Sequence, residues 1–236
     1  MSPADTPARS PKDGAGPLLG RCPVLPVVVL EDPDHALPMG EALLAGGIDT
    51  VEITLRTPAG LPGIRRLSTL PGMRVGAGSV LRPDQVDQAV AAGAEFVVSP
   101  GVSAGVLDRA RALTVPALPG VATASELMAV VERGLAEVKF FPAGLLGGPA
   151  AISALAGPFP GVSFMPSAGL DADTMARYLA LPCVPAVSGS WMVAPHLLAQ
   201  RRWAAVTDAA ARAMRTAART LAALPDRRPA HDPRPS

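Results

Sequence analysis

One lysine stands in a run of residues that otherwise has the composition of a buried strand. The 236-residue sequence contains 21 basic residues, of which only Lys12 and Lys139 are lysines. Lys139 lies in "EVKFFPA" (137–143), beside two phenylalanines. Desolvation destabilises an ammonium ion, and the free amine of a lysine can condense with a ketone to form a Schiff base. Arginine does not deprotonate, so this chemistry requires a lysine.

A carboxylate and a guanidinium lie in a second strand-like run, "DTVEITLR" (49–56). Side chains alternate along a strand, so Glu52 and Arg56 share one face, and Lys139 and Phe141 share a face of their own strand. Buried charges are costly unless they are paired or used. A structural ion pair is one interpretation. The combination of Lys, Glu and Arg at two strand ends favours a catalytic site.

Eight apolar runs are predicted to be strands because most are continuously apolar, as parallel strands covered on both faces are. They are "VLPVVVL" (24–30), "DTVEITLR" (49–56), "MRVGAGSV" (73–80), "AEFVVSP" (94–100), "TVPALPGV" (114–121), "EVKFFPA" (137–143), "GVSFMPSAG" (161–169) and "VPAVSGSW" (184–191).

Helical stretches alternate with these strands, and several carry start and stop signals. "TASELMAVVERGLA" (123–136) has the Thr123–Glu126 spacing of a capping box. The helices at 32–47, 82–94 and 171–181 also open on acidic residues or proline. Eight βα units predict an α/β fold, a single-domain (β/α)8 TIM barrel over residues 17–224. An open α/β sheet with six or seven strands is the alternative.

Composition narrows the class of protein. Residues 1–16 and 225–236 are rich in proline and charge, so we expect disordered tails. The net charge of +1, without a basic cluster that includes aromatic residues, argues against a nucleic-acid partner. Two distant cysteines and three scattered histidines predict no metal site. The run at 24–30 is too short to span a membrane and lacks a signal-peptide cleavage pattern, so a cytoplasmic location is expected.

Glycine and serine follow several strands at the end where barrel active sites form. These turns are "GAGSV" (76–80), "PSAG" (166–169) and "SGSW" (188–191). The loops after strands seven and eight of a (β/α)8 barrel often bind phosphate through backbone N–H groups. Ordinary tight loops are the alternative for each turn alone, whereas two such turns together predict a small anionic substrate.

Six motifs in order resemble the 2-keto-3-deoxy-6-phosphogluconate (KDPG) aldolase family, also called 4-hydroxy-2-oxoglutarate aldolases. The resemblance covers about residues 18–215, and its motifs are "VEITLRTP" (51–58), "GAGSVL" (76–81), "FVVSPG" (96–101), "PGVATASELM" (119–128), "VKFFPA" (138–143) and "ALAGPFPGVSFMPSAGL" (154–170). It implies a homotrimeric class I aldolase of the Entner–Doudoroff pathway with no metal or other cofactor. The implied partner is a keto-acid substrate, commonly a phosphorylated one.

The resemblance also implies roles for individual residues. Lys139 would form the Schiff base with the pyruvyl carbonyl, and Glu52 would act as general acid and base. Arg56 and Ser79 would hold the substrate carboxylate, a role that suits the planar fork of arginine. The pyruvate pocket would be lined by Pro100 and Phe141, and the phosphate loops would contain Ser167, Ala168, Gly169, Ser188, Gly189 and Ser190.

This chain departs from the family pattern at four of these positions. Ser79 and Ser167 stand for the usual threonines, while Ala168 and Ser188 replace glycines of the phosphate loops. Ala168 is expected to narrow the phosphate site, and Ser188 adds a hydroxyl donor. The preferred hypothesis is cleavage of KDPG to pyruvate and glyceraldehyde 3-phosphate. Two alternatives remain: the same mechanism on 4-hydroxy-2-oxoglutarate or the galactonate epimer, and a non-catalytic barrel that binds a sugar phosphate.

Overall fold

The computed structural model describes residues 18–224, so both predicted tails lie outside the described residues. Within this range the chain forms nine strands. They are β1 (Val24–Val28), β2 (Thr50–Thr54), β3 (Arg74–Gly78), β4 (Phe96–Val98), β5 (Ala117–Leu118), β6 (Gly120–Val121), β7 (Glu137–Phe140), β8 (Ser163–Pro166) and β9 (Val187–Gly189).

Each of the eight predicted strand regions contains a strand, and the fifth region is divided in two. Pro119 separates β5 from β6, and its carbonyl accepts a hydrogen bond from the backbone N–H of Lys139 (2.9 Å). Proline has no N–H to donate, so it interrupts a strand at this point. β5 therefore pairs with β4, whereas β6 pairs with β7.

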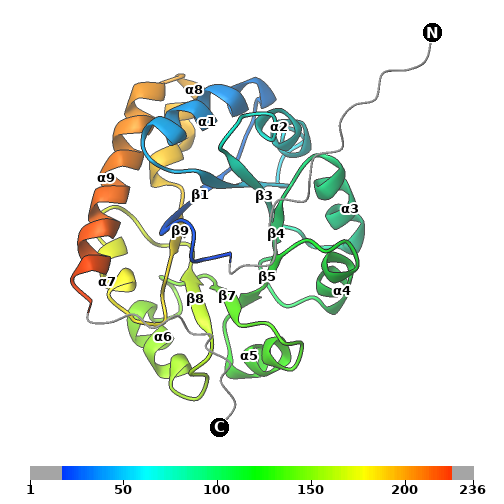
Figure 1. Ribbon diagram of the computed structural model, residues 1–236, viewed down its shortest axis with the longest axis vertical. Coiled ribbons are helices and arrows are strands. Elements are labelled where there is room, and N and C mark those ends of the chain that lie inside the picture. The colour runs from blue at the N-terminus through cyan, green and yellow to red at the C-terminus, as the bar shows by residue number, and fades with distance from the viewer. Residues whose placement is uncertain (1–17, 225–236) are drawn as a thin grey trace.

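The strands form a curled parallel sheet in two hydrogen-bonded parts. One part has the order β5-β4-β3-β2-β1-β9, the other has the order β6-β7-β8, and every pairing is parallel. An isolated parallel bridge joins Ser167, just after β8, to Ser188 of β9. The strands occupy the middle of the molecule and the helices surround them (Figure 1). The predicted α/β class with parallel strands is confirmed.

Helices connect the strands and cover the outer face of the sheet. Within residues 18–224 they are α1 (Ala36–Ala45), α2 (Gly60–Leu67), α3 (Pro83–Ala91), α4 (Ala104–Ala112), α5 (Ala124–Val131), α6 (Gly148–Ala156), α7 (Met175–Leu179), α8 (Pro195–Ala199) and α9 (Trp203–Ala222), with 3-10 helices η1 (Pro33–His35) and η2 (Trp191–Val193).

Two of the predicted helix starts show how local side chains set the boundaries. The capping box is confirmed: the Thr123 hydroxyl accepts from the N–H of Glu126, whose carboxylate accepts from the N–H of Thr123. The helix predicted at 171–181 is shorter, because Asp171 accepts from the backbone of Asp173 and Thr174 and forms a turn first. α7 therefore begins at Met175.

The buried apolar residues divide between the two faces of the sheet. Val51 and Ile53 of β2 and Val138 and Phe140 of β7 belong to the large cluster between strands and helices. This agrees with the predicted alternation. A second, smaller cluster lies on the inner face and contains Leu18, Leu19, Leu25, Phe96, Val98, Leu118, Met165 and Ala186. We call it the inner cluster.

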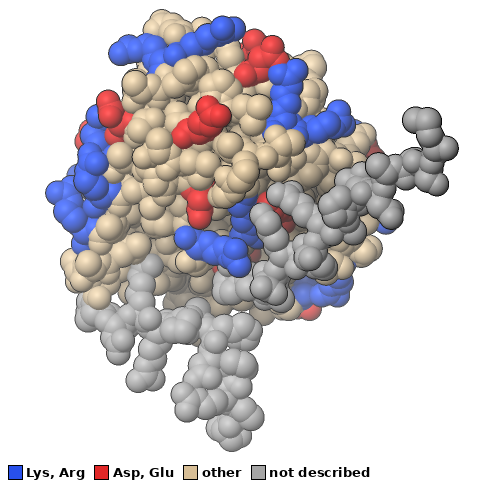
Figure 2. All heavy atoms as spheres, turned by 45° about the horizontal axis from the view of Figure 1, so that its top comes forward, with Lys and Arg blue, Asp and Glu red and all other residues tan. Residues whose placement is uncertain are grey.

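The surface offers no dominant charged patch on the face drawn in Figure 2, where acidic and basic side chains are interspersed with uncharged ones. No helix within residues 18–224 is both long and apolar enough to cross a membrane.

Candidate active site

Lys139 and Glu52 form a buried pair across the inner face of the sheet. Lys139 Nζ lies 3.3 Å from Glu52 Oε1 and 3.5 Å from Oε2, although the residues are 87 positions apart. Lys139 is 4% exposed and Glu52 is fully buried. Charge-assisted hydrogen bonds usually measure about 2.7–2.9 Å, so this contact is loose, as catalytic contacts often are without substrate. The geometry allows a proton to pass between the amine and the carboxylate.

Gly78 makes room for the Glu52 carboxylate, and the sequence analysis missed this residue. A Cβ atom on residue 78 would lie 2.0 Å from Glu52 Oε1. Gly78 pairs with Thr54 and Gly76 pairs with Glu52, so both glycines face inward from β3. The alternation in "GAG" (76–78) was the available signal, because small residues at two inward positions indicate close approach by a neighbour.

Arg56 lies in the turn after β2, so the prediction that the strand extends to Arg56 was wrong. The turn begins because the ladder between β2 and β3 ends at the pair of Thr54 and Gly78. Arg56 is exposed, and its Nε donates a hydrogen bond to Ser79 Oγ (2.9 Å). Ser79 has a positive φ of 57°. The two predicted carboxylate-binding residues are therefore in direct contact.

Phe141 lies beside Lys139, and the Pro100 backbone lies beside Gly120, the cross-strand neighbour of Lys139. Lys139 Nζ lies 5.6 Å from the centroid of the half-buried Phe141 ring. The carbonyl of Pro100 lies so close to Gly120 that a Cβ atom on residue 120 would lie 2.2 Å from the carbonyl oxygen. Gly120 is the direct neighbour of Lys139 in the pairing of β6 with β7. The glycine therefore brings the Pro100 backbone close to the lysine strand.

The turn after β8 lies beside the segment that follows Lys139. Ala143 N donates to Ser167 O (2.8 Å), and Gly144 N donates to Ala168 O (2.9 Å). Ala168 and Gly169 have φ values of 70° and 77°. These values lie in the left-handed region that glycine adopts easily, so Ala168 is strained where glycine would not be.

The end of β9 and Ser190 after it continue the same edge of the sheet. Ser188 is fully buried, and its hydroxyl donates to the carbonyl of Pro166 at a long 3.4 Å. Gly189 packs under the Trp191 ring, which a Cβ atom would meet at 2.0 Å. Ser190 is exposed. The Ser188 hydroxyl thus already has an acceptor in the neighbouring strand.

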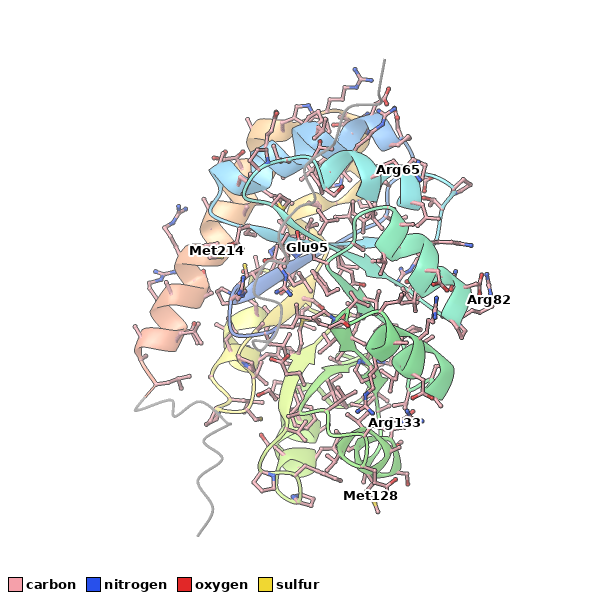
Figure 3. All side chains as sticks on the ribbon, turned by 45° about the vertical axis from the view of Figure 1, so that its right-hand side comes forward. Arg65, Arg82, Glu95, Met128, Arg133 and Met214 are labelled. Atoms are coloured by element: carbon pink, nitrogen blue, oxygen red, sulfur yellow. The ribbon has the colours of Figure 1, made fainter. Side chains whose placement is uncertain are left out.

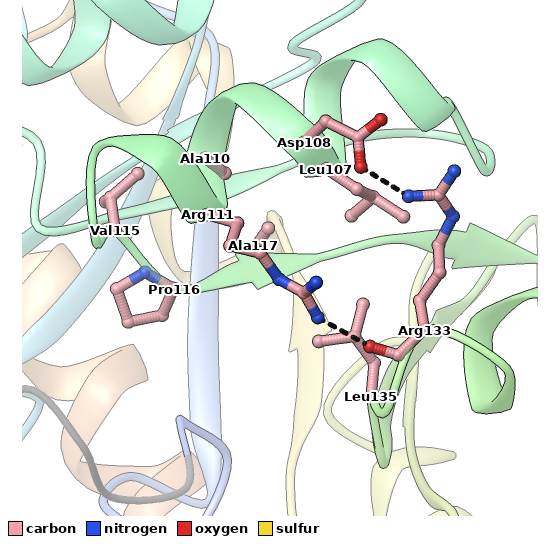
Figure 4. Close-up of a pocket in the computed structure, with 9 residues that line it drawn as sticks. All are labelled: Leu107, Asp108, Ala110, Arg111, Val115, Pro116, Ala117, Arg133 and Leu135. Carbon is pink, nitrogen blue, oxygen red and sulfur yellow. Dashed lines mark hydrogen bonds and ion pairs between the residues drawn. The ribbon is translucent and has the colours of Figure 1, made fainter.

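A hollow of about 210 Å³ lies between α4 and the turn before β7 (Figure 4). Arg133 pairs with Asp108 at its rim (2.5 Å), and Arg111 donates to the carbonyl of Arg133 (3.0 Å). None of the sequence-predicted site residues lines this hollow. The chemistry of the side chains, rather than the volume of a cavity, therefore identifies the candidate active site.

Comparison with known proteins decides the family. The family model described as KDPG and KHG aldolase matches residues 17–209. The chain belongs to this family. It is 46% identical over 184 residues to a 2-dehydro-3-deoxy-phosphogluconate aldolase of Pseudomonas aeruginosa, covering 78% of this chain and 84% of that one. It is therefore an enzyme of the aldolase class, a carbon–carbon lyase.

Two solved structures resemble this aldolase over most of its length. KDPG aldolase of Legionella pneumophila, with pyruvate captured as a covalent carbinolamine, matches with a TM-score of 0.81 and 39% identity, covering 83% of this chain and 96% of that one. KDPG aldolase of Zymomonas mobilis with 3-phosphoglycerate matches with a TM-score of 0.78 and 40% identity, covering 83% and 92%.

Proposed function

We propose that the protein is a class I aldolase that cleaves KDPG to pyruvate and glyceraldehyde 3-phosphate. The observation that carries this proposal is the buried contact between Lys139 Nζ and Glu52 Oε1 at 3.3 Å. A lysine amine next to a carboxylate, enclosed by apolar strands, has what imine formation needs: a nucleophile and a proton carrier. The carbinolamine in the Legionella relative supports the same chemistry here.

The reaction begins when the free amine of Lys139 adds to the C2 ketone of the substrate and forms a carbinolamine. Glu52 protonates the departing hydroxyl, which leaves as water, and the product is a protonated imine. The imine accepts the electron pair of the C3–C4 bond as Glu52 removes the proton of the C4 hydroxyl. The aldehyde departs, and an enamine remains. Protonation of the enamine and hydrolysis of the imine release pyruvate and restore the amine.

Arg56 and Ser79 are proposed to hold the substrate carboxylate. Arg56 uses Nε for Ser79 and, among residues 18–224, makes no hydrogen bond through its terminal nitrogens. A guanidinium fixed at one nitrogen can still donate to a carboxylate with the others. Phe141 and Pro100 are proposed to line the space beside Lys139, where the pyruvyl methylene would lie.

The turns at 167–169 and 188–190 are proposed to bind the phosphate. They lie side by side, since Ser167 and Ser188 form a bridge. The proposed donors are the backbone N–H groups of Gly169 and Ser190, whereas Gly189 lies within β9, where it pairs with β1. The 3-phosphoglycerate in the Zymomonas relative supports an anion site in this family.

A second candidate substrate is 4-hydroxy-2-oxoglutarate, which carries no phosphate. Two observations favour it: Ala168 occupies a strained position in the first turn, and the Ser188 hydroxyl is committed to Pro166. Comparing kcat/KM for KDPG and 4-hydroxy-2-oxoglutarate decides between them. We expect KDPG to react faster, since binding energy from a remote phosphate is used to orient the scissile bond. Equal values would make the smaller keto acid the substrate.

The closed (β/α)8 barrel and the single domain over residues 17–224 are part of this proposal. Closure is supported where the two parts of the sheet meet. Lys139 N donates to Pro119 O at one junction, and Phe164 N donates to Cys183 O (2.8 Å) beside the bridge between Ser167 and Ser188 at the other. A homotrimer, a cytoplasmic location and a place in the Entner–Doudoroff pathway are proposed from the family resemblance.

Trapping with borohydride tests the proposed function. Wild-type protein incubated with pyruvate and borohydride should gain one pyruvate-derived mass on the peptide that contains Lys139. Lys139→Arg should gain none and lose activity. Glu52→Gln should still be labelled but should lose about 10²–10⁴-fold in kcat, the usual contribution of a positioned acid and base. Labelling at Lys12, or an active Lys139→Arg variant, would contradict the Schiff-base mechanism.

A further inference from the structure

A second, half-buried carboxylate lies two residues before the lysine on the same strand. Glu137 opens β7, and because side chains alternate, it faces the same side as Lys139. Its Oε2 accepts a hydrogen bond from the backbone N–H of Leu18 (2.7 Å), and its Oε1 accepts from the N–H of Leu19 (3.0 Å). The strand of the catalytic lysine is therefore tied to residues about 118 positions earlier in the chain.

The segment held by Glu137 fills the inside of the sheet. Leu18 and Leu19 are 7% and 3% exposed and belong to the inner cluster, whose other members come from β1, β4, β5 and β8 and from the residue before β9. Two leucines from outside the sheet thus complete an apolar layer that the strands do not fill by themselves. Burying the two apolar side chains stabilises the folded state.

This apolar layer lies directly next to the catalytic pair. Met165 of the inner cluster is the cross-strand neighbour of Lys139 in the pairing of β7 with β8. Thr50, two residues before Glu52 and on the same face, lines a small gap together with Leu18 and Leu19. The same two leucines therefore lie under both strands that supply the pair.

We propose that Leu18 and Leu19 form a plug that keeps water from reaching Lys139 and Glu52 from the amino ends of the strands, and that Glu137 is the positioning residue that holds this plug. The proposal rests on the proposed function, since it concerns the environment of the Schiff-base lysine. Without the plug, water enters beneath Met165, and the contact between Lys139 and Glu52 weakens because the local dielectric rises.

The chemistry of Glu137 suits this role. A carboxylate only accepts hydrogen bonds, so it satisfies two backbone N–H groups at once. A glutamine presents one oxygen and one NH2, and the NH2 would meet one of the two N–H groups as donor against donor. Burial raises the pKa of Glu137, and the N–H groups of Leu19 and Leu18 and the guanidinium of Arg74 on β3 offset part of this shift by favouring the carboxylate. The carboxylate cannot be replaced by its amide without releasing part of the segment.

Three variants of the full chain test the proposal. Glu137→Gln removes one acceptor. The double variant Leu18→Ala, Leu19→Ala removes the apolar plug and leaves Glu137 in place, which keeps the test valid if the first variant does not fold. Glu95→Gln is the matched control, because Glu95 is a half-buried carboxylate directly before β4 (labelled in Figure 3) but receives no hydrogen bond from Leu18 or Leu19.

Three measurements are made on each variant: hydrogen exchange of the peptide that contains residues 18 and 19, the rate of borohydride trapping of pyruvate per folded molecule, and the pH profile of kcat/KM. We expect faster exchange, a loss of about threefold to thirtyfold in trapping rate, and a displaced pH profile for both plug variants. The control should match the wild type in all three.

A purely structural role would lower the melting temperature without changing the trapping rate per folded molecule or the pH profile. Such a result in both plug variants overturns the proposal, as does an equal loss in Glu95→Gln. The wild-type protein reports separately on the proposed function: if it does not trap pyruvate on Lys139, the Schiff-base mechanism fails. The trapping rate of each plug variant divided by that of the wild type tests the plug separately from the Schiff-base mechanism.

Discussion

Gly78→Ala should displace the catalytic carboxylate without unfolding the protein. The new Cβ atom would lie 2.0 Å from Oε1, 2.5 Å from Cγ and 2.6 Å from Cδ of Glu52. Contacts under 3.0 Å essentially never occur, so the Glu52 side chain must retreat by about 1 Å. Gly78 lies in the extended strand β3, where alanine is not strained. Misplacing a catalytic group by about 1 Å can cost on the order of 10²-fold in rate, and we expect a loss of this size in kcat.

Gly76→Ala is the matched control for this variant. It adds the same methyl group on the same strand and face, but the new atom would meet the Phe96 ring at 2.1 Å instead of Glu52. We expect Gly76→Ala to lower the melting temperature while retaining the trapping rate per folded molecule. Gly78→Ala should retain most of its melting temperature and lose kcat. An unchanged kcat in Gly78→Ala, or equal losses in both variants, would show that Gly78 does not position Glu52.

Two further predictions concern binding and stability. Arg56→Lys should raise KM for the keto acid about tenfold with a smaller change in kcat, because an ammonium cannot donate to a carboxylate and to Ser79 as a guanidinium does. Steady-state kinetics measures both constants. A kcat that falls as far as kcat/KM would argue against a role of Arg56 in substrate binding. Burial raises the pKa of Glu137 above its usual 4.5, partly offset by the N–H groups of Leu19 and Leu18. Its contribution to stability is therefore complete below about pH 4.5 and is lost as the pH rises through the raised pKa. As the pH rises through that range, the melting temperature of the wild type should fall relative to that of Glu137→Gln. A difference between the two melting temperatures that stays constant or rises with pH would refute a raised pKa for Glu137.

Much of the site could be predicted because its signals are local. Lys139 and Glu52 are charged residues within apolar runs, and alternation along each strand gives the face on which they lie. The resemblance assigned Arg56 and Ser79 to the same substrate carboxylate, and the structure adds that the two side chains are in contact at the shared edge of the parallel sheet. The end of β2 was predicted two residues too late, because the length of a strand depends on how far its neighbours continue the ladder.

The sequence alone determined which residues alternate between the faces of the sheet and which amine and carboxylate are available for chemistry. Only the tertiary structure decided three further points: that Gly78 gives Glu52 its space, that the Ser188 hydroxyl donates to Pro166, and that Glu137 holds Leu18 and Leu19. The physical reason is the range of each interaction. Alternation and turn chemistry act over a few residues, whereas a steric fit between strands and a carboxylate that binds a segment 119 positions away exist only once the chain is packed.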